Sequence, residues 1–171
     1  MREPIAIREQ RPGDAAAIRD LMVAAFAGPA EADLIERLRA DGDVVLELVA
    51  IAGDAVVGGV VFSRLAVTTV PERALVARVL APLAVAPDRQ RRGIGTALVR
   101  EGLARLDAAG TDLVLVLGDP DYYGRFGFRP GRPERMVSPY PVPENQWLAP
   151  GDRPLPPRMT VAYPRAFSGL A

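Results

Sequence analysis

The sequence contains no cysteine and no histidine. The absence of cysteine excludes a disulfide framework and a thiol nucleophile. The absence of histidine removes the commonest general base and the commonest zinc ligand, and with them any Ser-His-Asp or Cys-His mechanism. We therefore expect no metal centre, and a catalytic base would have to be a carboxylate or a water molecule held by backbone groups.

The chain also lacks an excess of charge and a long hydrophobic run. Its 171 residues include 21 basic and 21 acidic side chains, so nothing in the composition favours nucleic acid or an anionic membrane as a partner. The longest apolar run, residues 55–62, is too short to span a bilayer. Residues 1–5 include charge and proline where a signal peptide needs an apolar core. We expect one domain over residues 1–171, located in the cytoplasm.

Hydrophobic periodicity predicts a mixed α/β fold. The expected helices are residues 15–26, 30–40 and 94–106, with a short helix between Asp119 and Gly127. The expected strands are residues 5–8, 46–51, 55–65, 76–85, 113–117 and 158–163. Antiparallel strands come first and a parallel strand–helix–strand–helix unit follows, so we expect one mixed sheet with helices on both faces.

Residues 129–157 differ in composition from the rest of the chain. They contain nine of the seventeen prolines and show no periodicity. We expect an extended covering loop around Tyr140 and Trp147 rather than a separate domain, followed by a final strand over residues 158–163.

The most informative stretch joins the strand that ends at Val85 to the next helix. It reads Gln90-Arg91-Arg92-Gly93-Ile94-Gly95. Glycines at the start of a helix let backbone N–H groups approach an anion closely, and the helix dipole favours negative charge there. Two arginines in the same turn suit phosphate. The stretch therefore predicts a phosphate-binding loop.

Other interpretations of these glycines compete with a general phosphate site. A Walker loop needs Gly-Lys-Ser/Thr at its end, and the chain has none. A dinucleotide loop needs a third glycine where Leu98 stands, and residues 86–92 separate the strand from Gly93, although Asp119 lies near the expected place of a ribose-binding acid. A tight strand-to-helix turn with solvated arginines is the remaining alternative.

Two motifs together resemble the GCN5-related N-acetyltransferase (GNAT) superfamily. Residues 90–95 match the family's Gln/Arg-x-x-Gly-x-Gly/Ala signature, and residues 83–88 match the strand that leads to it. The second motif, residues 123–128, looks like the family's Tyr-x-x-x-Gly-Phe segment. The resemblance covers about residues 5–128 and the final strand. The segments at 118–123, 138–141 and 162–164 are most similar to the uncharacterised YhbS-type branch.

This resemblance implies the acyl-CoA N-acyltransferase fold and an acetyl-CoA-dependent N-acetyltransferase. Its acceptor would be a primary amine of a small molecule or peptide, and without cysteine the transfer would be a direct attack in a ternary complex. The alternative is a non-catalytic acyl-CoA-binding or regulatory module, because Asp119-Pro120 stands where many members have an asparagine that contacts pantetheine. The sequence leaves open which amine is used and whether the chain forms a homodimer.

The resemblance also implies where coenzyme A would bind. Leu83, Ala84 and Val85 would lie against the pantetheine arm, with the Val85 amide as the candidate donor to the thioester oxygen. The pyrophosphate would be held by the loop and the helix start: Gln90, Arg91, Arg92, Gly93, Ile94, Gly95 and Thr96.

Tyr123 stands where the family places a general acid. A phenol with a pKa of about 10 stays protonated at neutral pH and can donate to a thiolate; the alternative is an aromatic packing residue. Its neighbour Tyr122 is expected in the core or a pocket wall. Glu47 and Glu72 are the candidate bases, and each can equally be a surface carboxylate. Tyr140 and Trp147 could line the acceptor pocket.

Overall fold

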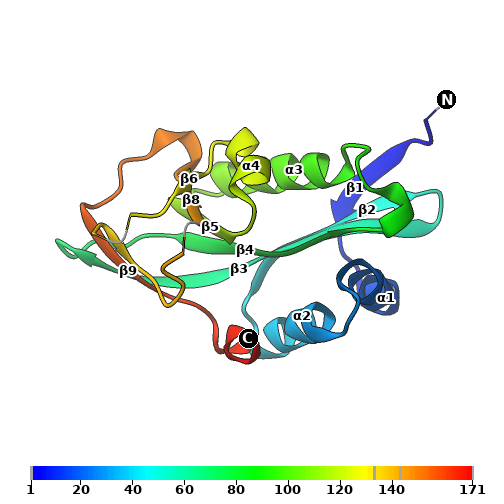
Figure 1. Ribbon diagram of the computed structural model, residues 1–171, viewed down its shortest axis with the longest axis horizontal. Coiled ribbons are helices and arrows are strands. Elements are labelled where there is room, and N and C mark those ends of the chain that lie inside the picture. Colours follow the sequence, from blue (N-terminus) through cyan, green and yellow to red (C-terminus); the bar gives the residue numbers. More distant parts are fainter. Residues whose placement is uncertain (1, 133, 143, 171) are drawn as a thin grey trace.

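The computed structural model describes residues 2–132, 134–142 and 144–170. Figure 1 shows three layers, with a sheet between two groups of helices. Below the sheet lie α1 (Ala15–Phe26) and α2 (Ala30–Asp41), and above it lie α3 (Ile94–Ala108) and α4 (Pro120–Tyr123). The mixed α/β fold with helices on both faces is thereby confirmed.

The strands form a sheet in the order β1-β2-β3-β4-β5-β8-β6, and β9 pairs with both β3 and β7. Their bounds are β1 Ile5–Glu9, β2 Val44–Ala52, β3 Ala55–Val70, β4 Ala77–Val85, β5 Leu113–Leu117, β6 Arg129–Pro130, β7 Met136–Val137, β8 Asn145–Leu148 and β9 Arg158–Ala162. Strands β1 to β4 are antiparallel neighbours, whereas β4 and β5 are parallel because α3 connects them. The predicted change from antiparallel pairing to a parallel β4–α3–β5–α4 unit is confirmed.

Strand β5 separates two hydrophobic clusters. Leu113 and Leu115 belong to the cluster that includes residues of α1 and α2, whereas Val114 and Val116 belong to the one that includes α3. All four side chains are buried. A strand buried on both faces has no solvent side and therefore needs no polar alternation, which explains its almost wholly apolar sequence.

The segment 129–157 differs from the unstructured covering loop that its composition suggested. Strand β8 pairs antiparallel with β5, with Trp147 opposite Leu115, and so removes an edge on which backbone N–H and C=O groups would lack partners. Its start is polar, yet Asn145 and Gln146 are 3% and 1% exposed. Their side-chain amides donate to the carbonyl oxygens of Tyr140 and Gly118. Because the buried residues at the start of β8 are polar, the strand shows no hydrophobic alternation, and the sequence pattern did not predict it.

Two of the expected segments differ from the description that the structure allows. Pro133 and Pro143, which belong to the segment predicted as a covering loop, lie outside the described residues. Strand β3 continues to Val70, beyond its expected end at residue 65, because its second half pairs with β9. Among the helices that the structure describes, none combines the length and apolar character needed to cross a membrane.

Close packing of α3 on the sheet gives a stability prediction. A Cβ atom at Gly102 would lie 2.3 Å from Cε2 of Phe62, a side chain with no exposed surface. We expect Gly102→Ala to lower the free energy of unfolding by about 1–3 kcal/mol, because the ring has no free space to move into. Urea denaturation measures the change. Gly13→Ala, whose Cβ would have no neighbour within 4 Å, is the matched control; a Gly102→Ala protein as stable as wild type would contradict the packing.

Candidate functional site

The pairing between strands β4 and β5 ends about halfway along β4. Their parallel register runs from Ala77 opposite Leu113 to Leu80 opposite Val116, although β4 continues to Val85. On its other side β4 stays paired with β3 to its end. Within the described residues no strand pairs with the β5-facing edge of residues 83–85. This stretch of backbone is therefore available to a ligand.

A β-bulge accompanies the divergence. Leu80 lies opposite Phe62 and Leu83 opposite Val60, so Ala81 and Pro82 together face one residue of β3. Such an extra residue bends its strand. Pro82 has no N–H to give to a ladder. The bulge thus marks the point where β4 turns away from β5.

A cavity of about 480 Å³ lies beside this divergence, and we call it the central cavity. Strands β4 and β5 and helices α1, α2 and α4 all contribute to its wall, together with Tyr140 and the chain after β9. Its lining residues are Phe26, Ala30, Glu31, Leu34, Val79, Leu80, Ala81, Pro82, Leu83, Leu117, Tyr123, Tyr140, Tyr163, Phe167, Gly169 and Leu170. Of the two aromatic residues proposed for an acceptor pocket, Tyr140 lines this cavity, while Trp147 lines a different one.

The predicted phosphate loop is the start of α3. The first helical hydrogen bond runs from Ala97 N–H to the Gly93 carbonyl, and no side chain caps the helix. The N–H groups of Ile94, Gly95 and Thr96 therefore remain available for an outside acceptor. Gly93 has φ of 83°, which glycine adopts without strain.

The loop's side chains divide into two roles. Arg91 and Arg92 are exposed and make no ion pair in the part of the chain that the structure describes. Gln90 instead donates its side-chain amide to the Val85 carbonyl at 3.1 Å. This hydrogen bond attaches the phosphate loop to the end of β4. The positive charge of the loop comes from Arg91 and Arg92.

Tyr122, which the sequence predicted in the core or a pocket wall, contacts the phosphate loop at the start of α3. A Cβ at Gly95 would lie 2.9 Å from the Tyr122 hydroxyl and 3.5 Å from Val85. Helix α4 therefore packs onto the start of α3, and Gly95 makes the room. The Arg125 guanidinium lies 4.4 Å from the centre of the Tyr122 ring. The glycine was a visible signal, but its aromatic partner was not.

Tyr123 lies in the wall of the central cavity. Its ring lies against Gly118, where a Cβ would be 2.4 Å from Cε2, and it contacts the Phe128 ring at a centroid distance of 5.8 Å. Burial raises the pKa of the Tyr123 phenol, and Tyr122 adds to the rise. The phenol stays protonated at neutral pH, and the ring packs as well as lining the cavity.

The two carboxylates named as candidate bases do not line the central cavity. Glu47 is buried on β2, where both its oxygens accept from the guanidinium of Arg39. Glu72 is exposed in the turn between β3 and β4. Glu31, in the first turn of α2, is the acidic residue among the lining side chains. No local pattern pointed to Glu31, because its position depends on how α2 packs over the sheet.

The comparisons with known proteins agree with this geometry. Residues 6–131 match the model of the acetyltransferase (GNAT) domain family. The chain is 37% identical over 134 residues to YjhQ of Escherichia coli K12, covering 77% of this chain and 74% of YjhQ. It is 41% identical over 123 residues to YhbS of the same strain, covering 71% of this chain and 72% of YhbS. Both are named uncharacterized N-acetyltransferases.

Two solved structures extend the similarity over nearly the whole chain. A GNAT family acetyltransferase from Brucella melitensis, in complex with acetyl-CoA, is 36% identical with a TM-score of 0.79 and covers 97% of this chain and 99% of its own. YhbS from Escherichia coli, in complex with CoA, is 32% identical with a TM-score of 0.86 and covers 100% of this chain and 96% of its own.

The environment of Tyr123 predicts a late phenol titration. Because burial disfavours the phenolate, Tyr123 should keep its proton above the ordinary pKa of about 10. The absorbance difference between wild type and Tyr123→Phe during an alkaline titration isolates this one phenol. The phenolate signal should emerge only above about pH 10; its appearance at lower pH would show that the ring is solvated.

Proposed function

Since this chain belongs to the GNAT family of acetyltransferases, we propose that it transfers the acetyl group of acetyl-CoA to a primary amine of a small molecule or peptide. Attack would be direct, within a ternary complex. The observation that carries the proposal is the central cavity, which adjoins the open edge of β4 and includes both Tyr123 and Glu31 in its wall. When bound, acetyl-CoA supplies an activated acyl group on a thiol leaving group.

Two neighbouring parts of the chain suit this cosubstrate, the start of α3 and the open edge of β4. The amides of Ile94, Gly95 and Thr96 face away from the helix and suit the pyrophosphate, with Arg91 and Arg92 as mobile cations. The open edge of residues 83–85 suits an extended amide-containing arm such as pantetheine, because its backbone groups lack a strand partner. Two related structures were solved in complex with acetyl-CoA and CoA, which supports the choice of cosubstrate.

In this proposal Glu31 is the general base of the central cavity and Tyr123 is the general acid. Attack by an amine requires its neutral form, so Glu31 would accept the amine's proton. Tyr123 would donate its own proton to the departing sulfur, which a protonated phenol can do. A C–N bond forms and the C–S bond breaks. One proton moves from the amine to Glu31, and one moves from Tyr123 to the departing sulfur, which gives the thiol. Transfer of the proton from Glu31 to the Tyr123 phenolate through solvent then restores both residues.

The alternative is a non-catalytic acyl-CoA-binding module, and the position of Asp119 bears on it. Asp119 replaces the asparagine typical of the family, and here its Oδ1 accepts from the Asp121 N–H at 2.9 Å. It caps α4 and so helps to place Tyr123. The departure therefore has a structural role that is compatible with catalysis.

Tyr123→Phe tests the acid. We expect kcat to fall about 100-fold while the affinity for acetyl-CoA changes little, because only a proton donor is removed. Tyr122→Phe is the matched comparison, and it should affect the acetyl-CoA KM rather than kcat, since its hydroxyl lies at the loop. Steady-state kinetics on a panel of amines gives both values.

Binding and turnover separate the possible failures. Stabilisation of the wild-type protein by acetyl-CoA in a thermal shift, without acetylation of any amine, would favour the module. Stabilisation by NAD and not by coenzyme A would overturn the proposal altogether. All 21 basic side chains are arginines, so the enzyme has no lysine that could take up acetyl groups in the assay.

Glu31→Gln tests the base. We expect kcat/KM for the amine to fall at least about tenfold, with coenzyme A binding retained, because the amide keeps the shape but cannot accept the proton. Glu36→Gln is the control on the same helix, and its surface ion pair with Arg19 contributes little. Equal activities of the two variants would assign the base elsewhere.

A further inference from the structure

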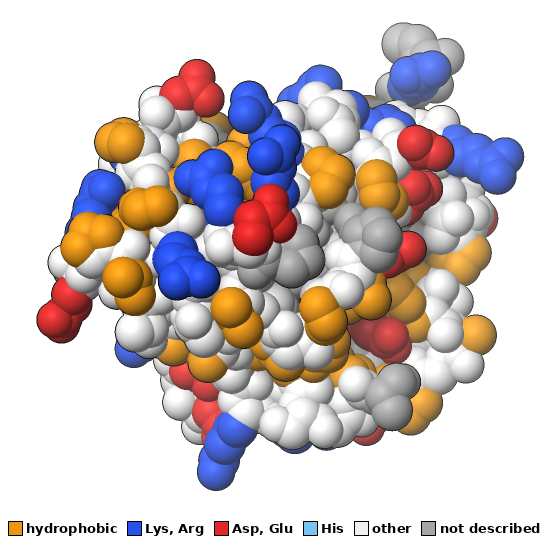
Figure 2. All heavy atoms as spheres, turned by 60° about the vertical axis from the view of Figure 1, so that its left-hand side comes forward, with side chains coloured by type: hydrophobic (Ala, Val, Ile, Leu, Met, Phe, Trp, Pro, Cys, Tyr) orange, Lys and Arg blue, Asp and Glu red, His pale blue; other side chains and the backbone are white. Residues whose placement is uncertain are grey.

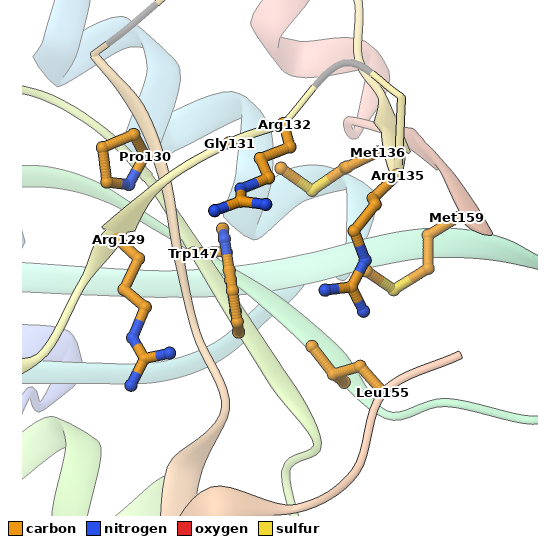
Figure 3. A pocket seen from close by; sticks show the side chains of 9 residues that line it. All are labelled: Arg129, Pro130, Gly131, Arg132, Arg135, Met136, Trp147, Leu155 and Met159. Atoms are coloured by element: carbon orange, nitrogen blue, oxygen red, sulfur yellow. The ribbon is translucent and has the colours of Figure 1, made fainter. Parts of the chain in front are cut away.

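A second cavity, of about 490 Å³, lies at the far end of the sheet, and we call it the arginine pocket. Strands β6, β7, β8 and β9 meet there. Figure 3 shows the residues that line it, among them Arg129, Arg132, Arg135, Trp147, Leu155 and Met159. None of these residues lines the central cavity.

The arginine pocket is separate from the site of acetyl transfer. Met159 of β9 lines the pocket, and Tyr163, four residues further on, lines the central cavity. Four residues of extended chain span about 13 Å. A small ligand in one cavity therefore does not fill the other.

Three guanidinium groups without an acidic partner define the pocket. The lining includes Arg129, Arg132 and Arg135 and no aspartate or glutamate. Across the described residues these three form no ion pair, whereas seven other arginines do: Arg8, Arg19, Arg39, Arg89, Arg105, Arg153 and Arg165. Like charges around one cavity repel each other, and an anion between them would relieve the repulsion.

An apolar surface lies among the charges. Arg129 is opposite Trp147 in the β6–β8 register, and its guanidinium lies 5.8 Å from the ring centre. Figure 3 shows the Trp147 ring edge-on between Arg129 and Arg135, with Leu155 below Arg135. The walls thus offer one aromatic face and aliphatic side chains beside the cations.

Backbone hydrogen bonds fix the positions of these arginines. The Arg132 carbonyl accepts from the N–H groups of Arg135 and Met136, at 2.9 and 2.8 Å, so the two arginines stand on one turn. Met159 N–H donates to the Arg135 carbonyl at 2.7 Å and ties that turn to β9. Gly131 is tightly enclosed, since a Cβ there would lie 3.0 Å from the Asn145 carbonyl oxygen.

The concentration of positive charge is local. The whole chain has a formal charge of zero. Figure 2, which brings this end of the molecule forward, shows basic side chains gathered over one part of the face, with hydrophobic side chains and an acidic one among them. A neutral chain that groups its arginines around a cavity indicates a defined ligand rather than general affinity for polyanions.

We propose that the arginine pocket binds a small organic anion, with its phosphate or carboxylate group on the three guanidiniums and its apolar body against Trp147. Guanidinium forms paired hydrogen bonds with both kinds of acid group. The volume is in the range of small-molecule sites. The pocket acts as a second site, occupied independently of coenzyme A.

Trp147 makes the site directly observable, because it is the chain's one tryptophan. Phenyl phosphate and phthalate serve as probes with an acid group on an aromatic body, and benzyl alcohol is the neutral counterpart. Each is titrated into the full chain both without coenzyme A and in the presence of saturating coenzyme A. We expect a saturable change in Trp147 fluorescence with at least one of the two acids and none with benzyl alcohol.

Arginine variants test which groups bind the probe. Arg132→Gln and Arg135→Gln should each weaken probe binding about tenfold, since a hydrogen bond to a charged group is removed. Both side chains are exposed and unpaired within the described residues, so the fold should tolerate the change. Arg11→Gln, an exposed arginine outside the pocket, should bind the probe as wild type does.

Four outcomes would overturn the proposal. They are no saturable response to either acid up to millimolar concentration, an equal response to benzyl alcohol, unchanged affinity in both pocket variants, or displacement of the probe by coenzyme A. A wild-type response to phenyl phosphate alone or phthalate alone would support the site and identify phosphate or carboxylate as the preferred group.

Discussion

The separation of β4 from β5 is the constraint on which the rest of the structure depends. Parallel strands in the middle of a sheet normally stay paired along their length, because unpaired backbone groups are costly when buried. Here pairing stops at Leu80, and a bulge containing Pro82 bends β4 away. The result is a strand edge without a partner, a cavity beside it, and a helix start at its end. A cosubstrate with an anionic head and an amide-rich arm matches all three features.

Glycines set the distances between these parts. Gly95 leaves room for the Tyr122 hydroxyl, Gly118 for the ring of Tyr123, and Gly102 for Phe62. Each removes one Cβ from a close approach, so aromatic rings lie directly on backbone. Site geometry and stability are thereby coupled at Tyr123, because its ring lines the cavity and also packs closely against the backbone of Gly118.

The arginines are grouped at particular places in the fold, although the chain has no excess of positive charge. The formal charge is zero, yet the arginines fall into distinct groups. Among the residues that the structure describes, seven are ion-paired with carboxylates, Arg91 and Arg92 flank the helix start, and three surround Trp147. Composition averages over these groups, so it argued against broad affinity for nucleic acid but gave no sign that three arginines surround one cavity.

The sequence by itself determined the layers, the order of the long strands and helices, and the glycine-rich helix start, because each depends on periodicity or on neighbouring residues. It also placed Tyr123 through a local motif. The tertiary structure alone decided the rest. Glu31 lines the cavity because α2 packs in the same hydrophobic cluster as Val79 of β4, whereas Glu47 lies on β2, outside the lining, and accepts from Arg39. Strand β8 and the arginine pocket likewise arise from contacts between residues far apart in the chain, which no local pattern encodes.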